Sequence, residues 1–364
     1  MKIFIAGATG AIGHPLISLL VAAGHDVIGM TSSERGLQTL REAGVEGVVA
    51  NALDALAVQV ATNKARPDAI IEELTSLPKH YTPEEMRAAA DRDRTVRLEG
   101  GRNLQNAARA VGARRYIVQS TGFFYAPGPG LATETEPLAL DASPAVSASV
   151  RTYTQIEQRV LGSPDLEGVA LRYGFFYGPE TWFTPDGDVA NQVRDRKLVI
   201  PGSGQGVWSW VHVEDAAAAT IAALECTPGV YNIVHSDPSE LSVWLPAFAG
   251  FVRAPAPLRV SEADALQSAG PDWIYYSTRL RGASNTKAKV ELCFAPRKLE
   301  WLAKRGPPRE PVVGFAVCRK ASLRTGLTSS SATQNSPDLA RDDRTFGRRL
   351  NQDQPVMIEL KPAT

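Results

Sequence analysis

The sequence has few cysteines and no long apolar run. Its three cysteines, Cys226, Cys293 and Cys318, are odd in number and lack metal-ligand spacing, so neither a disulfide framework nor a zinc site is indicated, and no metal is expected. No apolar run reaches the roughly 18 residues of a membrane-spanning helix, and the start "MKIFIAGATG" is too short and glycine-rich for a signal peptide. We therefore expect a cytoplasmic protein in a reducing compartment.

The chain also lacks an excess of either charge. Its 39 basic and 39 acidic residues balance, which removes the electrostatic attraction that would favour nucleic acid or an anionic membrane as the main partner. The 364 residues, 44% of them hydrophobic, are enough to bury a large core. These bounds favour one large domain or two modest ones with a small, neutral or weakly charged ligand, and they leave the oligomeric state open.

What the sequence does contain is an alternation of short β-branched runs with longer amphipathic ones. This alternation indicates βαβ units and an α/β fold, a doubly wound parallel sheet with helices on both faces. The segment "AIGHPLISLLVAAG" has helical spacing, with Pro15 in its first turn and Gly24 as its C-terminal stop. The predicted strands are "KIFIAG", "HDVIGMT", "EGVVAN", "DAIIEEL", "RYIVQST" and "GVALRYG".

The most informative motif follows the first predicted strand. "GATGAIG" puts Gly7, Gly10 and Gly13 at the head of the first helix, where glycines permit a tight turn, close approach of a pyrophosphate and close helix packing. Because the strand–turn–helix context is present, dinucleotide binding is favoured over a purely structural turn, and the fold is expected to be Rossmann-type. The same turn adds Thr9, Ala11 and Ile12 as predicted cofactor contacts.

This arrangement resembles the NAD-dependent epimerase/dehydratase family of extended short-chain dehydrogenases/reductases, whose fingerprint at this place is G-x-x-G-x-x-G. The resemblance spans residues 1 to about 301 and implies a small-molecule enzyme using NAD or NADP. The further segments that match the family are "RYIVQSTGFFYAP", "LRYGFFYGPET", "VWSWVHVEDAAAATIAAL", "GVYNIV" and "SNTKAKVELCFAP".

The resemblance and the pattern together divide the chain into three parts. Residues 1–174, with a strand and helix from 206–235, are expected to form the NAD(P)-binding Rossmann domain. Residues 175–303 are expected to form mainly the substrate-binding region. Residues 304–364 include the polar run "TGLTSSSATQNS" and lack apolar periodicity, so we expect a disordered tail that folding does not need.

The end of the second strand bears on the choice of cofactor. An NAD enzyme offers an acid there to the ribose 2′-hydroxyl, whereas this chain has Thr31, Ser32 and Arg35, which favour the 2′-phosphate of NADP over NAD. The alternative interpretation is that these are ordinary polar loop residues and that Glu34 approaches the ribose. The remaining predicted cofactor contacts are Asn51, Ala52, Leu53, Thr75 and Tyr153.

The family's catalytic pair, Y-x-x-x-K, is not intact. If Tyr153 is the catalytic tyrosine, Glu157 takes the position of the lysine; if the helix is aligned on its apolar spacing, Tyr153 takes that position and Ser149 the position of the tyrosine. We prefer the second alignment. No lysine results either way, so the proton-transfer pair of the family is replaced.

Other polar residues are candidates with more ordinary alternatives. The resemblance places Thr121 at the serine position of the fifth-strand turn, and Tyr125 and Arg151 could approach the nicotinamide or be packed or solvated. We expect three further residues to be structural: His212 as a hydrogen-bonded histidine, Asp215 as a helix N-cap, and Cys293 as a small buried residue.

Aromatic residues gather beside the loops of the expected substrate region. Core packing is the default interpretation for them, and a pocket for a flat or apolar substrate is the alternative. They are Phe175, Phe176, Trp182, Phe183, Trp208 and Trp210.

Three functions are consistent with these features. The first is an NADP-dependent oxidoreductase acting on a carbonyl or alcohol group of a small molecule. The second is an epimerase or dehydratase that recycles its cofactor within one turnover. The third is a redox sensor that binds the dinucleotide without catalysis. The intact substrate-region motifs favour an enzyme over the sensor, and we rank the oxidoreductase first.

Overall fold

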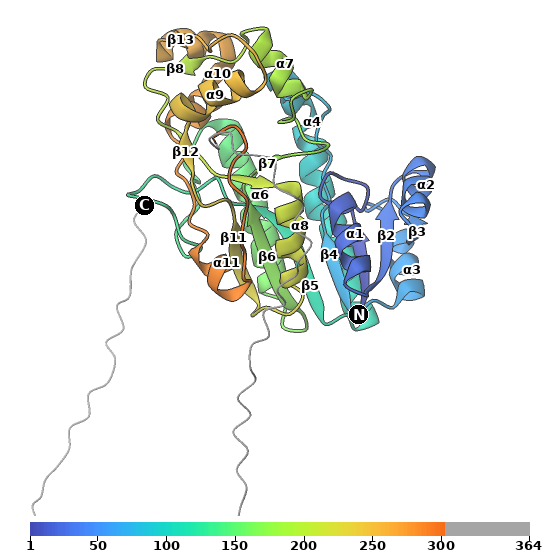
Figure 1. The fold of residues 1–364 in the computed structure, drawn as a ribbon. Helices are drawn as coiled ribbons and strands as arrows, with labels where there is room; N and C mark the ends of the chain where they lie inside the picture. Colours follow the sequence, from blue (N-terminus) through green and yellow to red (C-terminus); the bar gives the residue numbers. More distant parts are fainter. Residues whose placement is uncertain (303–364) are drawn as a thin grey trace, which may run out of the picture. The chain divides into compact units, whose positions relative to one another are not determined.

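The computed structural model describes residues 1–302, and its centre is a seven-stranded sheet (Figure 1). The strand order is β11-β6-β5-β4-β1-β2-β3, and every neighbouring pair is parallel. The predicted fold class and all the predicted strands are confirmed. The strands are β1 (Lys2–Ala6), β2 (Asp26–Thr31), β3 (Glu46–Val49), β4 (Ala69–Glu72), β5 (Arg115–Thr121), β6 (Glu167–Tyr173) and β11 (Gly229–Ile233).

Helices cover both faces of this sheet, because alternate strand residues point to opposite sides and both sides are apolar. In β1, Ile3 and Ile5 enter the core beneath α1 (Gly13–Ala22), α8 (Val213–Ala222) and α11 (Thr286–Glu291). Phe4 and Ala6 enter the core on the other face. That face is covered by α3 (Ala55–Ala65), α5 (Gly101–Val111) and α6 (Pro144–Leu161), and α2 (Glu34–Glu42) packs beside β2 and β3.

The first crossover helix forms as its sequence predicts. Pro15 lies in the first turn of α1, where its missing N–H has no helical partner to lose. Gly24 follows the helix with a left-handed φ of 79° and donates its N–H to the carbonyl of Val21. The helix therefore turns the chain directly into β2.

The strand order reverses between β1 and β4. From β1 the chain proceeds outward through β2 and β3, then crosses back to β4 on the opposite side of β1. In a parallel sheet this reversal leaves a crevice at the carboxyl ends of the two strands, where ligands bind. The loops after β1 and β4 line this crevice.

A second group of elements lies beyond the carboxyl ends of the central strands, at the top of Figure 1. Its core is rich in aromatic residues, with Trp208, Trp210 and Trp244 all fully buried. The group comprises α4 (Pro83–Thr95), β7 (Phe175–Tyr177), α7 (Asp188–Arg194), β8 (Ile200–Pro201), β9 (Val207–Trp208), β10 (Trp210–His212), β12 (Ser239–Glu240), α9 (Leu241–Phe251), β13 (Arg259–Val260) and α10 (Glu262–Thr278). The π-helical turn η1 (Val96–Gly100) continues α4 into α5 and packs beside α6, with Val96 and Leu98 against the core of the central sheet.

Predictions from the sequence also concern the tail, membrane-spanning helices and the division into domains. The predicted tail, residues 304–364, lies outside the described residues. None of the helices formed by residues 1–302 combines the length and the apolar character needed to cross a membrane. The division between a Rossmann domain and a substrate region stays a prediction, although β6 ends at Tyr173, where that division was placed.

Trp244→Ala is expected to cost about 3–5 kcal/mol of unfolding free energy, because the side chain is fully buried on α9 against Trp208 and Trp210. Val243→Ala on the same helix is the matched control, since Val243 is 51% exposed, and a change within about 0.5 kcal/mol is expected. Urea unfolding measures both. Similar losses from the two variants would contradict this description of the core.

Candidate functional site

The glycine turn between β1 and α1 is shaped by close backbone contacts. Gly7 has a φ of 84°, and a Cβ there would lie 2.4 Å from the carbonyl oxygen of Glu73. A Cβ at Gly13 would lie 2.2 Å from the carbonyl oxygen of Ala8. These two glycines therefore meet packing requirements of the turn itself.

Gly10 differs from these two glycines because it is exposed. Its nearest neighbour to an added Cβ is the carbonyl oxygen of Gly7, at 3.3 Å. Between Gly7 and Gly13 the turn also carries Thr9, Ala11 and Ile12, and α1 begins here with no acidic residue in its first turn. An open backbone surface at a helix N-terminus suits the phosphates of a dinucleotide.

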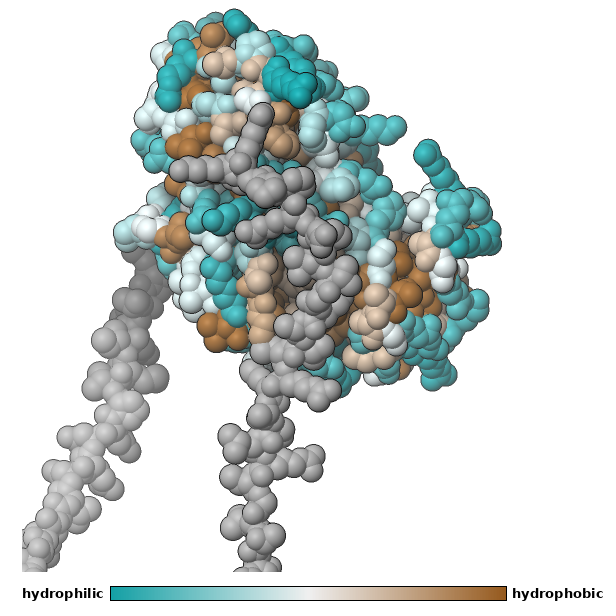
Figure 2. Space-filling view, in the orientation of Figure 1, coloured by the Kyte–Doolittle hydropathy of each residue, from teal (hydrophilic) through white to brown (hydrophobic). Residues whose placement is uncertain are grey.

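The end of β2 carries hydroxyl groups and a cation. Ser33 caps α2 by accepting a hydrogen bond from the N–H of Gly36, at 3.1 Å. Thr31 is buried, whereas Ser32 and Arg35 are exposed. Figure 2 shows hydrophilic residues gathered over α2. The arrangement leaves Arg35 accessible to an anionic group beside β2.

The turn after β3 is ordered by its own side chain. The carboxamide oxygen of Asn51 accepts a hydrogen bond from the N–H of Leu53, at 3.0 Å. The carbonyl oxygen of Ala52 accepts one from Asn103, at 2.9 Å. Thr75, beyond β4, is exposed. The structure therefore places these predicted contacts in the loops after β3 and β4, and their role in cofactor binding stays a prediction.

Sequence reasoning missed two adjacent buried acids at the end of β4. The carboxylate of Glu72 points to the α6 side of the sheet, where it accepts hydrogen bonds from Arg159 at 2.9 Å and from the hydroxyl of Tyr116 at 2.5 Å. Burial of this carboxylate is therefore balanced by a cation and a hydroxyl.

Glu73 points to the opposite side of the sheet and lacks such compensation. Its Oε1 accepts a hydrogen bond from Tyr173 at 3.1 Å, while its Oε2 is buried without a partner in the described part of the chain. Burial is the main cause that raises the pKa of Glu73 to about 8; Tyr173 and Arg97 oppose the shift. Near pH 7 Glu73 is therefore mainly a neutral acid beneath Gly7.

Two candidate residues lie on β5 and α6. Thr121 ends β5, is 1% exposed, and its hydroxyl has no partner within residues 1–302. Tyr153 is half-buried on α6, with the guanidinium of Arg97 5.2 Å from its ring centroid. Burial raises the pKa of Tyr153 above its ordinary value, with Arg97 opposing the shift. The Tyr153 hydroxyl therefore holds its proton, as expected of a tyrosine without the lysine of the family.

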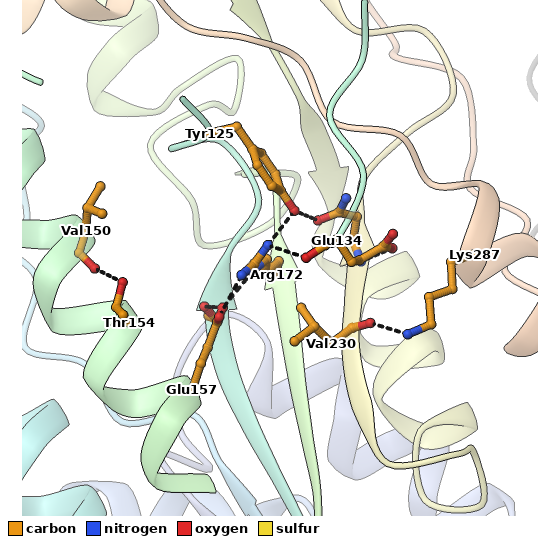
Figure 3. Close-up of polar contacts among 10 residues, drawn as sticks. Tyr125, Glu134, Val150, Thr154, Glu157, Arg172, Val230 and Lys287 are labelled. Atoms are coloured by element: carbon orange, nitrogen blue, oxygen red, sulfur yellow. Dashed lines mark hydrogen bonds and ion pairs between the residues drawn. The ribbon is translucent and has the colours of Figure 1, made fainter. Parts of the chain in front are cut away.

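Glu157 and Tyr125 belong to a buried network that ties α6 to the sheet (Figure 3). Both oxygens of Glu157 accept hydrogen bonds from Arg172, each at 2.7 Å, and Ser120 donates to one of them at 2.6 Å. Arg172 also donates to the hydroxyl of Tyr125, which in turn donates to Asn232 at 2.6 Å.

This network has two consequences for the predicted site. Glu157 faces β5 and β6 from within the core, which favours the alignment that places Tyr153 at the position of the lysine. Tyr125 is fully buried and its hydroxyl is already bonded, which agrees with the packed alternative, and a role beside the nicotinamide stays a prediction. Arg151 is exposed on α6. The catalytic roles of Thr121 and Tyr153 stay predictions.

Three residues expected to be structural have mixed outcomes. His212 is hydrogen-bonded, as predicted: its Nδ1 accepts from the N–H of Glu214 at 3.2 Å. Burial, reinforced by the charge of Arg297, lowers the pKa of His212 to about 4, so the ring is neutral near pH 7. His212 is itself the N-cap of α8, so the prediction that Asp215 is the cap is wrong; Asp215 binds Arg297 at 3.0 Å.

The prediction for Cys293 is also wrong. This residue is exposed, with a left-handed φ of 52°. A left-handed conformation strains a residue that carries a side chain.

The predicted aromatic residues are mostly core. Phe175 stacks between Phe123 and Trp208, with centroid distances of 4.0 and 4.1 Å. Phe175 is 8% exposed and Trp208 is 1% exposed, whereas Phe123 and Tyr276 are half-buried at the surface of this cluster. Packing is therefore the main role of the buried rings. Any aromatic surface offered to a ligand comes from the half-buried ones.

The fold, the reversal point and the open glycine turn define a dinucleotide-binding α/β protein. The sequence matches the NAD dependent epimerase/dehydratase family over residues 3–233, and the chain belongs to that family. Membership of an NAD-dependent family and a turn that fits a dinucleotide support an enzyme of the oxidoreductase type that uses a nicotinamide dinucleotide.

The chain is also similar to individual proteins in sequence and in fold. The chain is 40% identical over 306 residues to the 3-diazoavenalumate denitrifying reductase of a Streptomyces species, covering 83% of this chain and 98% of the relative. It is 26% identical over 286 residues to the 2-alkyl-3-oxoalkanoate reductase of Stenotrophomonas maltophilia, covering 74% and 80%. The fold is similar to that of UDP-glucose 4-epimerase from Thermus thermophilus in complex with NAD, with a TM-score of 0.61 and 24% identity over 83% of this chain and 96% of that one.

Replacing Gly10 by Val is expected to abolish dinucleotide binding while the protein stays folded, because the added side chain fills the open surface of the turn. Gly13→Ala is the contrasting variant. Its Cβ would overlap the backbone of Ala8, so a loss of about 1–3 kcal/mol or more in unfolding free energy is expected. Calorimetric titration with cofactor and thermal unfolding separate the two effects. Unchanged affinity in Gly10→Val would remove the cofactor interpretation.

Glu73→Gln is expected to stabilise the protein increasingly as the pH rises. The pKa of Glu73 is about 8 in the folded protein against 4.5 ordinarily, so the folded state holds the extra proton and loses stability between these values. At about 1.36 kcal/mol per pH unit this loss reaches roughly 4 kcal/mol near pH 8, and a neutral glutamine avoids it. Urea unfolding of both proteins at about pH 5 and about pH 8 tests this; a pH-independent difference would contradict it.

Proposed function

We propose that this protein is a nicotinamide-dependent reductase that replaces an aryl diazo group with hydrogen and releases dinitrogen. The observation that carries the proposal is a site with a dinucleotide-binding turn and no lysine four residues after Ser149 or Tyr153 on α6. The alignment with the denitrifying reductase covers 98% of that relative, whose name contains a diazo compound. This similarity supports the same reaction class here.

Reduction of a diazo group does not require the tyrosine–lysine pair of the family. When bound, the reduced nicotinamide supplies a hydride to the aryl carbon: one C–H bond forms, the C–N bond breaks, and dinitrogen leaves with that bonding pair. The aryl diazonium cation on the reactant side is matched by the positive charge of the oxidised nicotinamide on the product side. The reaction therefore consumes no proton. A tyrosine activated by a lysine is therefore unnecessary, in contrast to carbonyl reduction, in which the alkoxide must gain a proton.

The chain's own residues would bind and orient the reactants. The glycine turn holds the phosphates, and Tyr153, neutral and half-buried, bonds the ribose as a hydroxyl. Thr121 offers an unpartnered hydroxyl to a polar atom of the substrate. The half-buried rings of Phe123 and Tyr276 offer apolar surface to a flat, aromatic small molecule.

Reduction of a carbonyl is the second candidate. It follows from the family resemblance and is supported by the relative named as an oxoalkanoate reductase. In that reaction Thr121 would be the hydroxyl nearest to the substrate oxygen, without a cation to lower its pKa. No specific observation favours the other two functions, an epimerase or dehydratase and a redox sensor without catalysis. The cytoplasmic location stays a prediction.

We infer NADPH as the preferred reductant. No acid ends β2, and Arg35 is exposed on the first turn of α2 beside Ser32. Arg35→Ala is expected to weaken NADPH binding about tenfold or more and to change NADH binding less than about twofold, as for loss of a charge-assisted contact to the 2′-phosphate. Fluorescence titration with both cofactors measures this. Equal losses would show that Arg35 does not face a 2′-phosphate.

The reaction is tested by supplying NADPH with benzenediazonium and, separately, with aromatic aldehydes and ketones. The proposal predicts one dinitrogen and one arene for each NADPH oxidised, with little oxidation by the carbonyl compounds. The Gly10→Val variant is the control for reaction in solution, because it is expected to fold without binding cofactor. Turnover of carbonyl compounds without turnover of the diazonium would favour the second candidate.

A further inference from the structure

Arg97 is a buried cation beside Tyr153, the residue at the position of the family lysine in the preferred alignment. It lies in the π-helical turn η1, between α4 and α5, and is 4% exposed. Its guanidinium lies 5.2 Å from the ring centroid of Tyr153 on α6. Single π turns within helices occur frequently at functional sites, because the wider turn redirects a side chain. The cation therefore reaches the crevice from a different element than in a Y-x-x-x-K site.

The guanidinium is only partly engaged. Its Nε donates to Asp93 at 2.7 Å, and neither terminal nitrogen makes a hydrogen bond in the part of the chain that the structure describes. The two nitrogens are absent from the fully buried atoms without a partner, so they keep some access to solvent and can be reached by a ligand. Two terminal nitrogens in one plane match the two oxygens of a carboxylate, and this geometry distinguishes arginine from lysine.

Asp93 is the one carboxylate that pairs with Arg97 in the described part of the chain, and it does so through Nε alone. Asp93 shares its carboxylate with the backbone N–H of Ser76, at 2.6 Å. Glu72 is bonded to Arg159 at 2.9 Å. Glu73 is mainly protonated near pH 7, since its pKa is about 8. Among residues 1–302 no second carboxylate therefore occupies the two terminal nitrogens of Arg97.

We propose that Arg97 binds a carboxylate of the substrate through its two terminal nitrogens, with the aromatic part of the substrate lying against Tyr153 and Tyr276. This inference rests on the proposed function, because it assumes a small aromatic substrate in the crevice. Both tyrosines are half-buried members of the aromatic cluster. Arg97 then selects aromatic carboxylates over their uncharged analogues.

Two substitutions separate charge from geometry. Arg97→Gln removes the cation, and Arg97→Lys keeps the cation but lacks the planar pair of donors. Arg94→Gln is the matched control, because Arg94 lies one turn earlier on α4, is exposed, and pairs only with Asp91 at 2.9 Å in the described part of the chain. Thermal unfolding establishes first that each variant is folded.

Binding is measured without turnover. Calorimetric titration of the NADP⁺-loaded protein with 4-hydroxybenzoate and with its methyl ester is expected to show at least a tenfold preference for the acid. Arg97→Gln should abolish this preference, Arg97→Lys should reduce it, and Arg94→Gln should leave it unchanged. The affinity of every variant for NADP⁺ should stay within about twofold of that of the wild type.

Two results would overturn the inference. One is a preference for the acid that persists in Arg97→Gln. The other is a loss of NADP⁺ affinity in Arg97→Gln, which would place Arg97 on the cofactor. If a variant does not fold, comparison of the acid and the ester on the wild type alone still decides, because absence of a preference there contradicts a carboxylate site.

A turnover experiment distinguishes failure of this inference from failure of the proposed reaction. Wild-type protein with NADPH is given 4-carboxybenzenediazonium or its methyl ester, and kcat/KM is expected to favour the acid at least tenfold. Equal turnover of both compounds would overturn the role of Arg97 and retain the reductase. Absence of turnover with a preserved preference in binding would retain Arg97 and reject the diazo reaction.

Discussion

The close contact between Gly7 and the backbone of Glu73 is the constraint on which the rest of the site depends. It joins the first residues after β1 and β4, the two strands between which the strand order reverses. With a Cβ at Gly7 the carbonyl oxygen of Glu73 would be only 2.4 Å away, so the turn could not descend between the strands. Because the turn passes this close to β4, Gly10 is left exposed and α1 begins beside the carboxyl ends of the two strands.

Buried charge is distributed unevenly around this crevice. Glu157 and Arg172, and likewise Glu72 and Arg159, compensate one another between α6 and the face of the sheet that it covers. Such pairs contribute more to a defined arrangement of elements than to net stability, because desolvation offsets their attraction. Glu73, Thr121 and Arg97 are different, since each retains polar atoms without a partner among residues 1–302. Buried polar atoms without a partner also occur elsewhere in residues 1–302, and these three groups are the ones that a cofactor and substrate beside the glycine turn would satisfy.

The sequence was sufficient for the sheet and the cofactor turn and insufficient for the chemistry of the site. Apolar runs and glycine spacing are local signals, so β1 to β6, α1 and the family assignment could be predicted. The pair "EE" at the end of β4 was the one visible sign of Glu73, as acids rarely end a buried strand. Arg97 had no signal, because it is one of several charges in "DRDRTVRLEG" and its burial results from packing against α6. Asp215 was misassigned because the capping group came from a histidine ring one position before the helix.

The absence of an activated proton donor is the central claim, and solvent isotope incorporation tests it most directly. The protein is given NADPH and an arenediazonium in D2O, and the arene is examined by mass spectrometry and NMR. The proposal predicts that the carbon that bore nitrogen carries hydrogen from the cofactor and no solvent deuterium. Deuterium at that carbon, or no arene while a carbonyl compound is reduced, would contradict it.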